Sequence, residues 1–153
     1  MSILTVQARS ASFAVARLFA LTLVRFALLA RWGLALLFLY HGLVPKLLWL
    51  SADERLMIVA HGVAHIELVA TLAGLAEIVM ALVLLVVRQS RWPLVVSALL
   101  LAGLLLDVAL FTPGLLIQAF NPLSTNLVAL CLCLVGWWAE APARGGQSPG
   151  LAD

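Results

Sequence analysis

Charged residues are scarce in this chain, which has nine basic and seven acidic residues among 153. The formal net charge of +2 is too small to indicate a nucleic-acid-binding protein. The sequence also lacks the GxSxG, GxxxxGK and GxGxxG patterns of serine hydrolases, phosphate-binding loops and dinucleotide-binding folds. It therefore carries no signature of these enzyme classes, and whether the protein is an enzyme stays open.

Cysteine is almost absent too. Cys131 and Cys133 lie in one apolar run, where two helical positions separate their side chains by about 200°, so a disulfide between them is not expected. Neither belongs to a CxxC redox motif, and we expect both to be small buried hydrophobes. A cleavable signal peptide is not expected either, because the apolar stretch 18–24 is short and Arg25 follows it at once.

Hydrophobic residues, by contrast, make up 65% of the chain, and the mean hydropathy is +1.15. Soluble domains are roughly 45–50% apolar, so one soluble core could not bury this excess. A lipid bilayer is the natural solvent, and helix is the natural conformation because lipid offers backbone groups no hydrogen-bond partners.

Four segments have the roughly 20 apolar residues that a membrane-spanning helix needs. They are residues 25–44, 63–87, 92–111 and 122–138. The fourth has a clear start, with Asn121 as N-cap and Pro122 at the first helical position. We therefore predict an all-α integral membrane four-helix bundle over residues 25–139. Residues 1–24 should extend the first helix into the cytoplasm or lie along the interface, and residues 140–153 should form a disordered cytoplasmic tail.

The distribution of arginine predicts the orientation of the bundle. Five arginines fall in the N-terminus, the second loop and the C-terminus: Arg9, Arg17, Arg88, Arg91 and Arg144. Only Lys46 and Arg55 fall in the other two loops, so both termini should lie inside the cell.

With this orientation, all four helices place polar residues near their outer ends. We predict that a ligand-binding polar layer is formed there by Tyr40, His41, Lys46, His65, Glu67, Asp107, Asn121 and Asn126. The alternative is ordinary interfacial decoration, since lysine and tyrosine are common at membrane boundaries. Glu67 and Asp107 favour the functional interpretation, because carboxylates are costly in lipid.

Two further charges lie deeper. Arg31 precedes Val44 by 13 residues and Glu77 follows Val63 by 14, which puts both roughly 20 Å below the outer boundary. We predict an intramembrane ion pair between them; the alternative is that Arg31 reaches the inner headgroups.

His61 and His65 have the i, i+4 spacing of helical zinc ligands, and His41 is a conceivable third ligand. Glu67 projects about 160° away from His65 on a helix and cannot complete that site. We therefore predict no metal, and histidines that are hydrogen-bonded at the membrane surface.

Three motifs resemble the DoxX-like family of small four-helix membrane proteins. They are Arg31 followed by Tyr40-His41-Gly42-Leu43-Val44-Pro45-Lys46-Leu47-Leu48, then Gly74-Leu75-Ala76-Glu77, and finally Phe120-Asn121-Pro122-Leu123 with Asn126. The resemblance runs over about residues 31–139 and implies a four-helix bundle. His41 departs from the pattern, which usually has glutamine there.

Relatives of this family are associated with thiosulfate:quinone oxidoreductase subunits and other membrane redox complexes, and more distant ones with assembly. The resemblance therefore suggests redox work. Our hypothesis is a small redox-associated subunit of a bacterial cytoplasmic (inner) membrane that binds a quinone-like ligand. A membrane or soluble redox protein as partner and homo-oligomerisation are left open. A membrane scaffold or assembly factor, and a small transporter, stay open as alternatives.

Overall fold

The computed structural model describes residues 3–119 and 121–140, and its side chains from residue 14 onward. Of the tail predicted to be disordered, residues 141–153 lie outside the described residues. The prediction is wrong for Glu140, which is buried and forms the C-cap of the helix Pro122–Ala139. Within the described residues the chain forms five α-helices and two short helical segments of other types, and no strand. The elements are α1 (Ile3–Gly42), the π-helical segment η1 (Leu43–Leu48), α2 (Ala52–Ala60), α3 (Ile66–Val86), α4 (Trp92–Phe111), the 3-10 segment η2 (Pro113–Ile117) and α5 (Pro122–Ala139).

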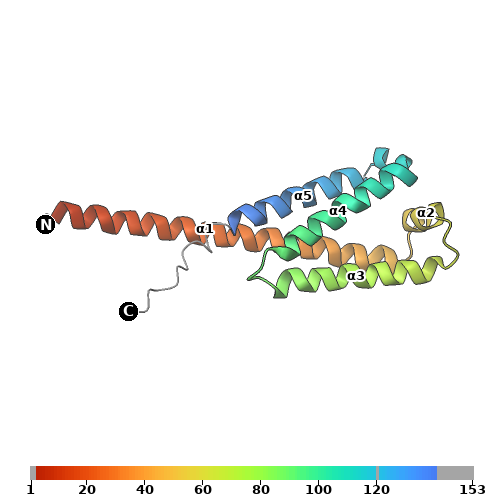
Figure 1. Cartoon of the computed structure of the whole chain (residues 1–153), viewed down its shortest axis with the longest axis horizontal. Coiled ribbons are helices and arrows are strands. Elements are labelled where there is room, and N and C mark those ends of the chain that lie inside the picture. The colour runs from red at the N-terminus through yellow and green to blue at the C-terminus, as the bar shows by residue number, and fades with distance from the viewer. Residues whose placement is uncertain (1–2, 120, 141–153) are drawn as a thin grey trace.

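Four of these helices are long and apolar enough to cross a membrane, as the composition predicts. Their spans are Ala14–Leu48, Ile66–Val86, Trp92–Phe111 and Pro122–Ala139. They run side by side as a bundle in which α1 packs most extensively against α3 and α5, and α4 packs against α5 (Figure 1). The bundle has an α2 end, which also holds η1 and η2, and an α3–α4 end, at which α5 finishes (Figure 1).

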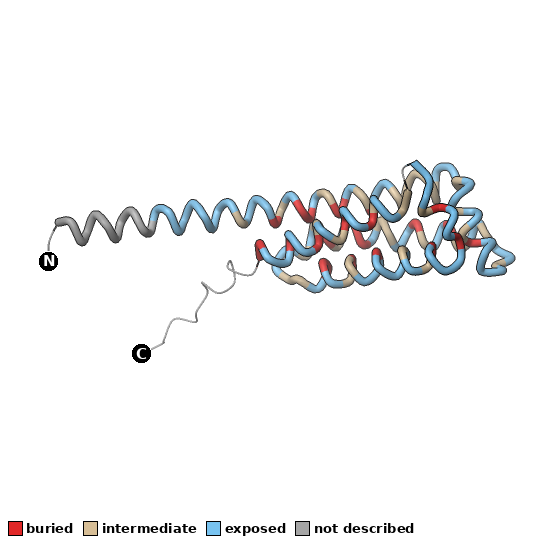
Figure 2. Tube along the Cα trace, turned by 90° about the horizontal axis from the view of Figure 1, so that it is seen from above, coloured by how far each residue is buried: buried red, intermediate tan, exposed pale blue. Residues whose placement is uncertain are grey.

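Buried residues lie where the helices face one another, and exposed residues cover the outside of the bundle (Figure 2). Many of the exposed residues are large and apolar. Leu34, Phe38, Leu84, Leu94 and Leu101 are almost completely buried in the core between the helices. Most other large hydrophobic residues on the four long helices are exposed. In water this surface would aggregate, but in a bilayer it contacts acyl chains, so the burial pattern is that of a membrane protein.

Two glycines set the distance between α1 and α3. A Cβ atom added to Gly42 would lie 2.5 Å from the carbonyl oxygen of Gly74, and one added to Gly74 would lie 2.6 Å from that of Gly42. The two backbones are therefore in direct contact, as small residues permit in membrane bundles.

The first helix is longer than one crossing requires. The span Ala14–Leu48 has 35 residues, roughly 50 Å of helix, against a hydrocarbon core of about 30 Å. Its N-terminal half projects past the α3–α4 end of the bundle (Figure 1). The described residues before Arg25 continue the first helix without a break, which is one of the two arrangements expected for them.

Two local features differ from the sequence-based expectation. The first span does not end at residue 44 as predicted, because the chain widens into η1 and continues to Leu48. The connection between the first two spans also contains the short helix α2, whose N-cap is Ser51; the Ser51 hydroxyl accepts a hydrogen bond from the backbone N–H of Glu54. Both features place charged residues across the α2 end.

Candidate functional site at the α2 end

A charged cluster lies at the α2 end, between α1, α2 and α3. Nζ of Lys46 lies 2.7 Å from Oε1 of Glu54 and 3.2 Å from both carboxylate oxygens of Glu77. The Lys46 side chain is only 7% exposed, and each glutamate side chain is 12% exposed. One ammonium is thus shared by two carboxylates in a place that water hardly reaches. We call Lys46, Glu54 and Glu77 the lysine cluster.

The backbone around Pro45 explains why Lys46 turns inward. Proline has no N–H, so it cannot donate to the carbonyl of His41 four residues earlier. The Lys46 ammonium donates to that carbonyl at 3.5 Å, and the π-helical turn of η1 shifts its side chain toward α3. Such turns are frequent at functional sites.

The close contact between α1 and α3 brings the other members into reach. A Cβ atom added to Gly42 would lie 3.0 Å from Cβ of Glu77, and one added to Gly74 would lie 3.1 Å from Cβ of Lys46. Both side chains therefore start next to the glycine crossing. Glu54 comes from the first turn of α2, where a carboxylate is also stabilised by the helix dipole. Three separate elements therefore build the lysine cluster.

A second polar contact ties the α2–α3 connection to α4. Nδ1 of His61 lies 2.8 Å from the carbonyl oxygen of Met57, and Nε2 lies 2.8 Å from Oδ1 of Asp107. Both partners are acceptors, so only the doubly protonated imidazolium satisfies both contacts. The hydrogen bond to the Met57 carbonyl, followed by the one to Asp107, raises the pKa of His61 above its ordinary value. The His61 ring also packs against Phe111, with centroids 4.3 Å apart.

The predicted polar layer is divided by this arrangement. His41 and Lys46 adjoin each other, and Tyr40 meets the His41 ring edge-on with centroids 5.9 Å apart. Asp107 belongs instead to the contact with His61. Among the described residues, no hydrogen bond or ion pair joins the remaining four to the lysine cluster. His65 and Glu67 are exposed at the start of α3, Asn121 caps α5 by accepting from the N–H of Ser124, and Asn126 is buried in α5. Ligand binding by the layer stays a prediction.

The predicted ion pair between Arg31 and Glu77 is wrong. Nε of Arg31 lies 2.6 Å from Oε1 of Glu140, and Glu77 pairs with Lys46. The prediction assumed that Val44 and Val63 lie at one level. The contact between Gly42 and Gly74 sets the relative height of the two helices instead. Arg31 lies 11 residues from Gly42, whereas Glu77 lies only three from Gly74. Arg31 and Glu77 are therefore roughly 12 Å apart along the helix axes.

Arg31 has a structural role at the α3–α4 end. Its guanidinium donates to the carbonyl oxygens of Leu84, Val87 and Ser90 at 3.1, 2.9 and 2.6 Å, and the side chain is 2% exposed. The last carbonyls of a helix have no partner within it. Arg31 therefore satisfies the end of α3 and the turn that follows it.

Two members of the site were missed by the sequence analysis, Glu54 and His61 as the partner of Asp107. The signal for Glu54 was present, because Ser51-Ala52-Asp53-Glu54 has the Ser-x-x-Glu spacing of a helix N-terminus. The geometry assumed for the histidines was wrong, since residues 61–65 are not helical and α3 begins at Ile66. His61 and His65 therefore share no helix face, and the described residues contain no group of three potential metal ligands.

The cysteine prediction is half right. Cys133 is buried in the core, and Cys131 is exposed on the surface of α5; both are free thiols.

The comparison with known families agrees with this architecture. The model of the DoxX-like family matches residues 35–134, about two thirds of the chain, and the protein belongs to that family. The match includes the lysine cluster and leaves out Arg31. No curated protein and no solved structure matches the chain.

Proposed function

We propose that this DoxX-like membrane protein is a small subunit of a redox system, which binds a quinone-like ligand beside Tyr40 and His41 and exchanges protons through the lysine cluster. The lysine cluster carries the proposal. Two carboxylates flank one ammonium, so with both ionised the cluster has a surplus negative charge, and one added proton makes it neutral. Ionisable groups of this kind within a membrane bundle mark ligand and proton pathways.

The neighbouring residues have the chemistry that a quinone requires. Quinones combine an apolar body with two carbonyl groups and supply two-electron, two-proton chemistry when bound. Tyr40 offers a phenolic O–H on a side chain that is 60% exposed on the outside of the bundle, within reach of a ligand that arrives through the lipid. The adjacent imidazole of His41 can donate or accept a proton. Electrons would come from a partner redox protein.

The sidedness follows from the arginine pattern. With the α3–α4 end in the cytoplasm of a bacterial cell, the lysine cluster faces the outer side of the cytoplasmic membrane. Protons released there would leave toward the outside. Glu54 stands in α2 between two spans and would be the exit group, whereas Glu77 stands within α3.

Native mass spectrometry of the protein extracted mildly from its own membrane tests this function. A retained quinone-sized mass is expected, and it should be lost in Tyr40→Phe and weakened in Glu77→Gln. Asp53→Asn is the matched control, because Asp53 is an exposed carboxylate in the same helical turn as Glu54 and lies outside the predicted polar layer. A chain without such a mass, which also fails to bind an added quinone analogue, contradicts the proposal.

One observation favours a second function, that of a membrane scaffold. Val15, Leu18 and Phe19 are each about two-thirds exposed and belong to the N-terminal half of α1. That half of the helix projects beyond the bundle (Figure 1). An apolar helix longer than the bilayer needs a cover, which a larger membrane protein would provide. In that case Leu18→Ala and Phe19→Ala should abolish a large complex on native gels, while Leu72→Ala, exposed on α3, should not. A complex that survives both substitutions in α1 would exclude this docking mode.

A further inference from the structure

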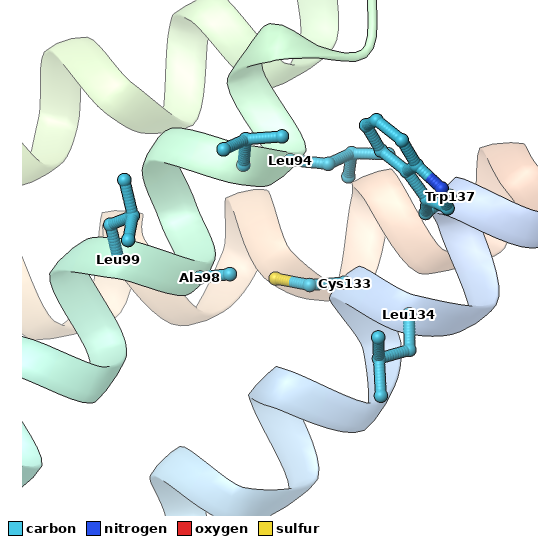
Figure 3. Close-up of a pocket in the computed structure, with 7 residues that line it drawn as sticks. Leu94, Ala98, Leu99, Cys133, Leu134 and Trp137 are labelled. Atoms are coloured by element: carbon cyan, nitrogen blue, oxygen red, sulfur yellow. The ribbon is translucent and has the colours of Figure 1, made fainter.

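An apolar groove lies between α4 and α5 on the lipid-facing side, near the α3–α4 end. Its volume is about 250 Å³, and its walls come from Leu94, Val95 and Ala98 of α4 and from Cys133, Leu134 and Trp137 of α5 (Figure 3). Sites for whole small molecules are usually 300–1,000 Å³. This groove therefore fits part of a chain-like ligand better than an entire compact one.

Arg91 lies at the same end of the groove as Trp137. It is the N-cap residue of α4, and its guanidinium carbon lies 4.9 Å from the centre of the Trp137 ring. Nε of Arg91 is buried and makes no hydrogen bond with any residue that the structure describes. A buried donor without a partner is unfavourable. Arg91 as a whole is only partly buried, so the rest of its guanidinium can meet an acceptor from outside the bundle.

The charges around Arg91 indicate the sign of the missing partner. Arg31 has Glu140 as its counter-ion. Among the residues that the structure describes, Arg88 donates only to the carbonyl of Leu85, and Arg91 has no carboxylate partner. Arg88 and Arg91, which both lie in the connection between α3 and α4, thus have no counter-ion among the described residues. A negatively charged group would be attracted there, and guanidinium pairs with phosphate oxygens in a bidentate manner.

We propose that this groove and Arg91 form a binding site for one anionic phospholipid. Part of an acyl chain lies along the groove, and the phosphate accepts hydrogen bonds from the Arg91 guanidinium. Trp137 stands between the two parts, as tryptophan does at the boundary between headgroups and acyl chains. A phospholipid has an apolar chain followed by an anionic headgroup. The groove, the indole of Trp137 and the guanidinium of Arg91 follow one another in the same order.

The site can be tested on the full-length protein in detergent micelles that contain equimolar phosphatidylglycerol and phosphatidylcholine with identical acyl chains. Native mass spectrometry should find one retained lipid with a preference for phosphatidylglycerol. Arg91→Gln should reduce that preference roughly tenfold, because a charge-assisted hydrogen bond is lost. Arg88→Gln is the matched control from the same turn and should leave most of the preference.

A second pair of variants probes the groove without touching a charge. Val95 and Leu100 are 41% and 45% exposed on α4, and only Val95 lines the groove. Val95→Phe should fill it and lower the retention of both lipids, whereas Leu100→Phe should have no effect. Equal losses from Arg91→Gln and Arg88→Gln would mean diffuse attraction to basic residues and would overturn the site. Displacement of the lipid by inorganic phosphate, retention unaffected by Val95→Phe, or a dimer that Val95→Phe dissociates would overturn it as well.

Discussion

Lys46 and Glu77 face each other across a crossing of two glycines, and the ammonium of one lies 3.2 Å from the carboxylate of the other. The contact exists because Gly42 and Gly74 let α1 and α3 touch through their backbones. Glu54 then binds the same ammonium from α2. The charged cluster and the helix crossing are therefore one structural unit, and each can be tested separately.

The glycine crossing predicts a sharp difference between two alanine substitutions. Gly74→Ala would place a methyl group 2.6 Å from a backbone carbonyl that cannot move aside, which should lower the free energy of unfolding by roughly 1–3 kcal/mol. Gly103→Ala in α4 meets nothing within 4 Å and should be neutral or stabilise by up to about 1 kcal/mol. Thermal unfolding in detergent, followed by circular dichroism, measures both. Equal effects would mean that α1 and α3 do not touch at Gly74.

The lysine cluster predicts unequal costs for its members. Lys46→Met leaves two carboxylates facing each other without a counter-ion and should cost roughly 3–5 kcal/mol of stability. Glu54→Gln leaves Lys46 with Glu77 and should cost less than about 1 kcal/mol. Asp53→Asn, an exposed neighbour in the same helical turn, is the control. A Lys46→Met protein that is as stable as the Asp53→Asn protein would show that Lys46 lies in water and not between the two glutamates.

Arg31 should be hard to replace. Arg31→Ala removes a counter-ion from Glu140 and the donors to three carbonyls, so a loss of roughly 3–5 kcal/mol is expected. Arg31→Lys should rescue only part of it, because one ammonium cannot reproduce the fork of the guanidinium. Arg25→Ala, two turns earlier and exposed, is the control. If Glu77→Gln restored the stability of Arg31→Ala, the assignment of Glu140 as the partner would be wrong.

The contact between His61 and Asp107 should depend on pH. The folded pKa of His61 is raised above its unfolded value, so the stabilisation is complete below the unfolded pKa and is lost as pH rises through the folded pKa. Titration of the imidazole signals by NMR should give a pKa above about 6.5 that falls in Asp107→Asn. Glu67→Gln removes a nearby exposed carboxylate that His61 does not contact, and should leave the titration unchanged. An unaltered pKa in Asp107→Asn would rule out the contact.

The sequence alone determined that this is a four-span helical membrane protein of the DoxX-like family. Long apolar runs exceed what a soluble core can hold, and the motifs around Tyr40, Gly74 and Asn121 carry the family resemblance. Helix starts were also readable where a cap residue precedes proline, so α5 begins at Pro122 as predicted. These features depend on residues that are close together in the sequence, so they can be predicted without knowing how the helices pack.

Only the tertiary structure decided which charges meet. The sequence gives spacing along each helix, but the relative height of two helices depends on where their surfaces interlock, here at Gly42 and Gly74. An error of roughly 12 Å in that height was enough to exchange the partners of Arg31 and Glu77. The short helix α2 and the π-helical turn at Pro45 also decide which charges meet, because they bring Glu54 and Lys46 over the end of α3.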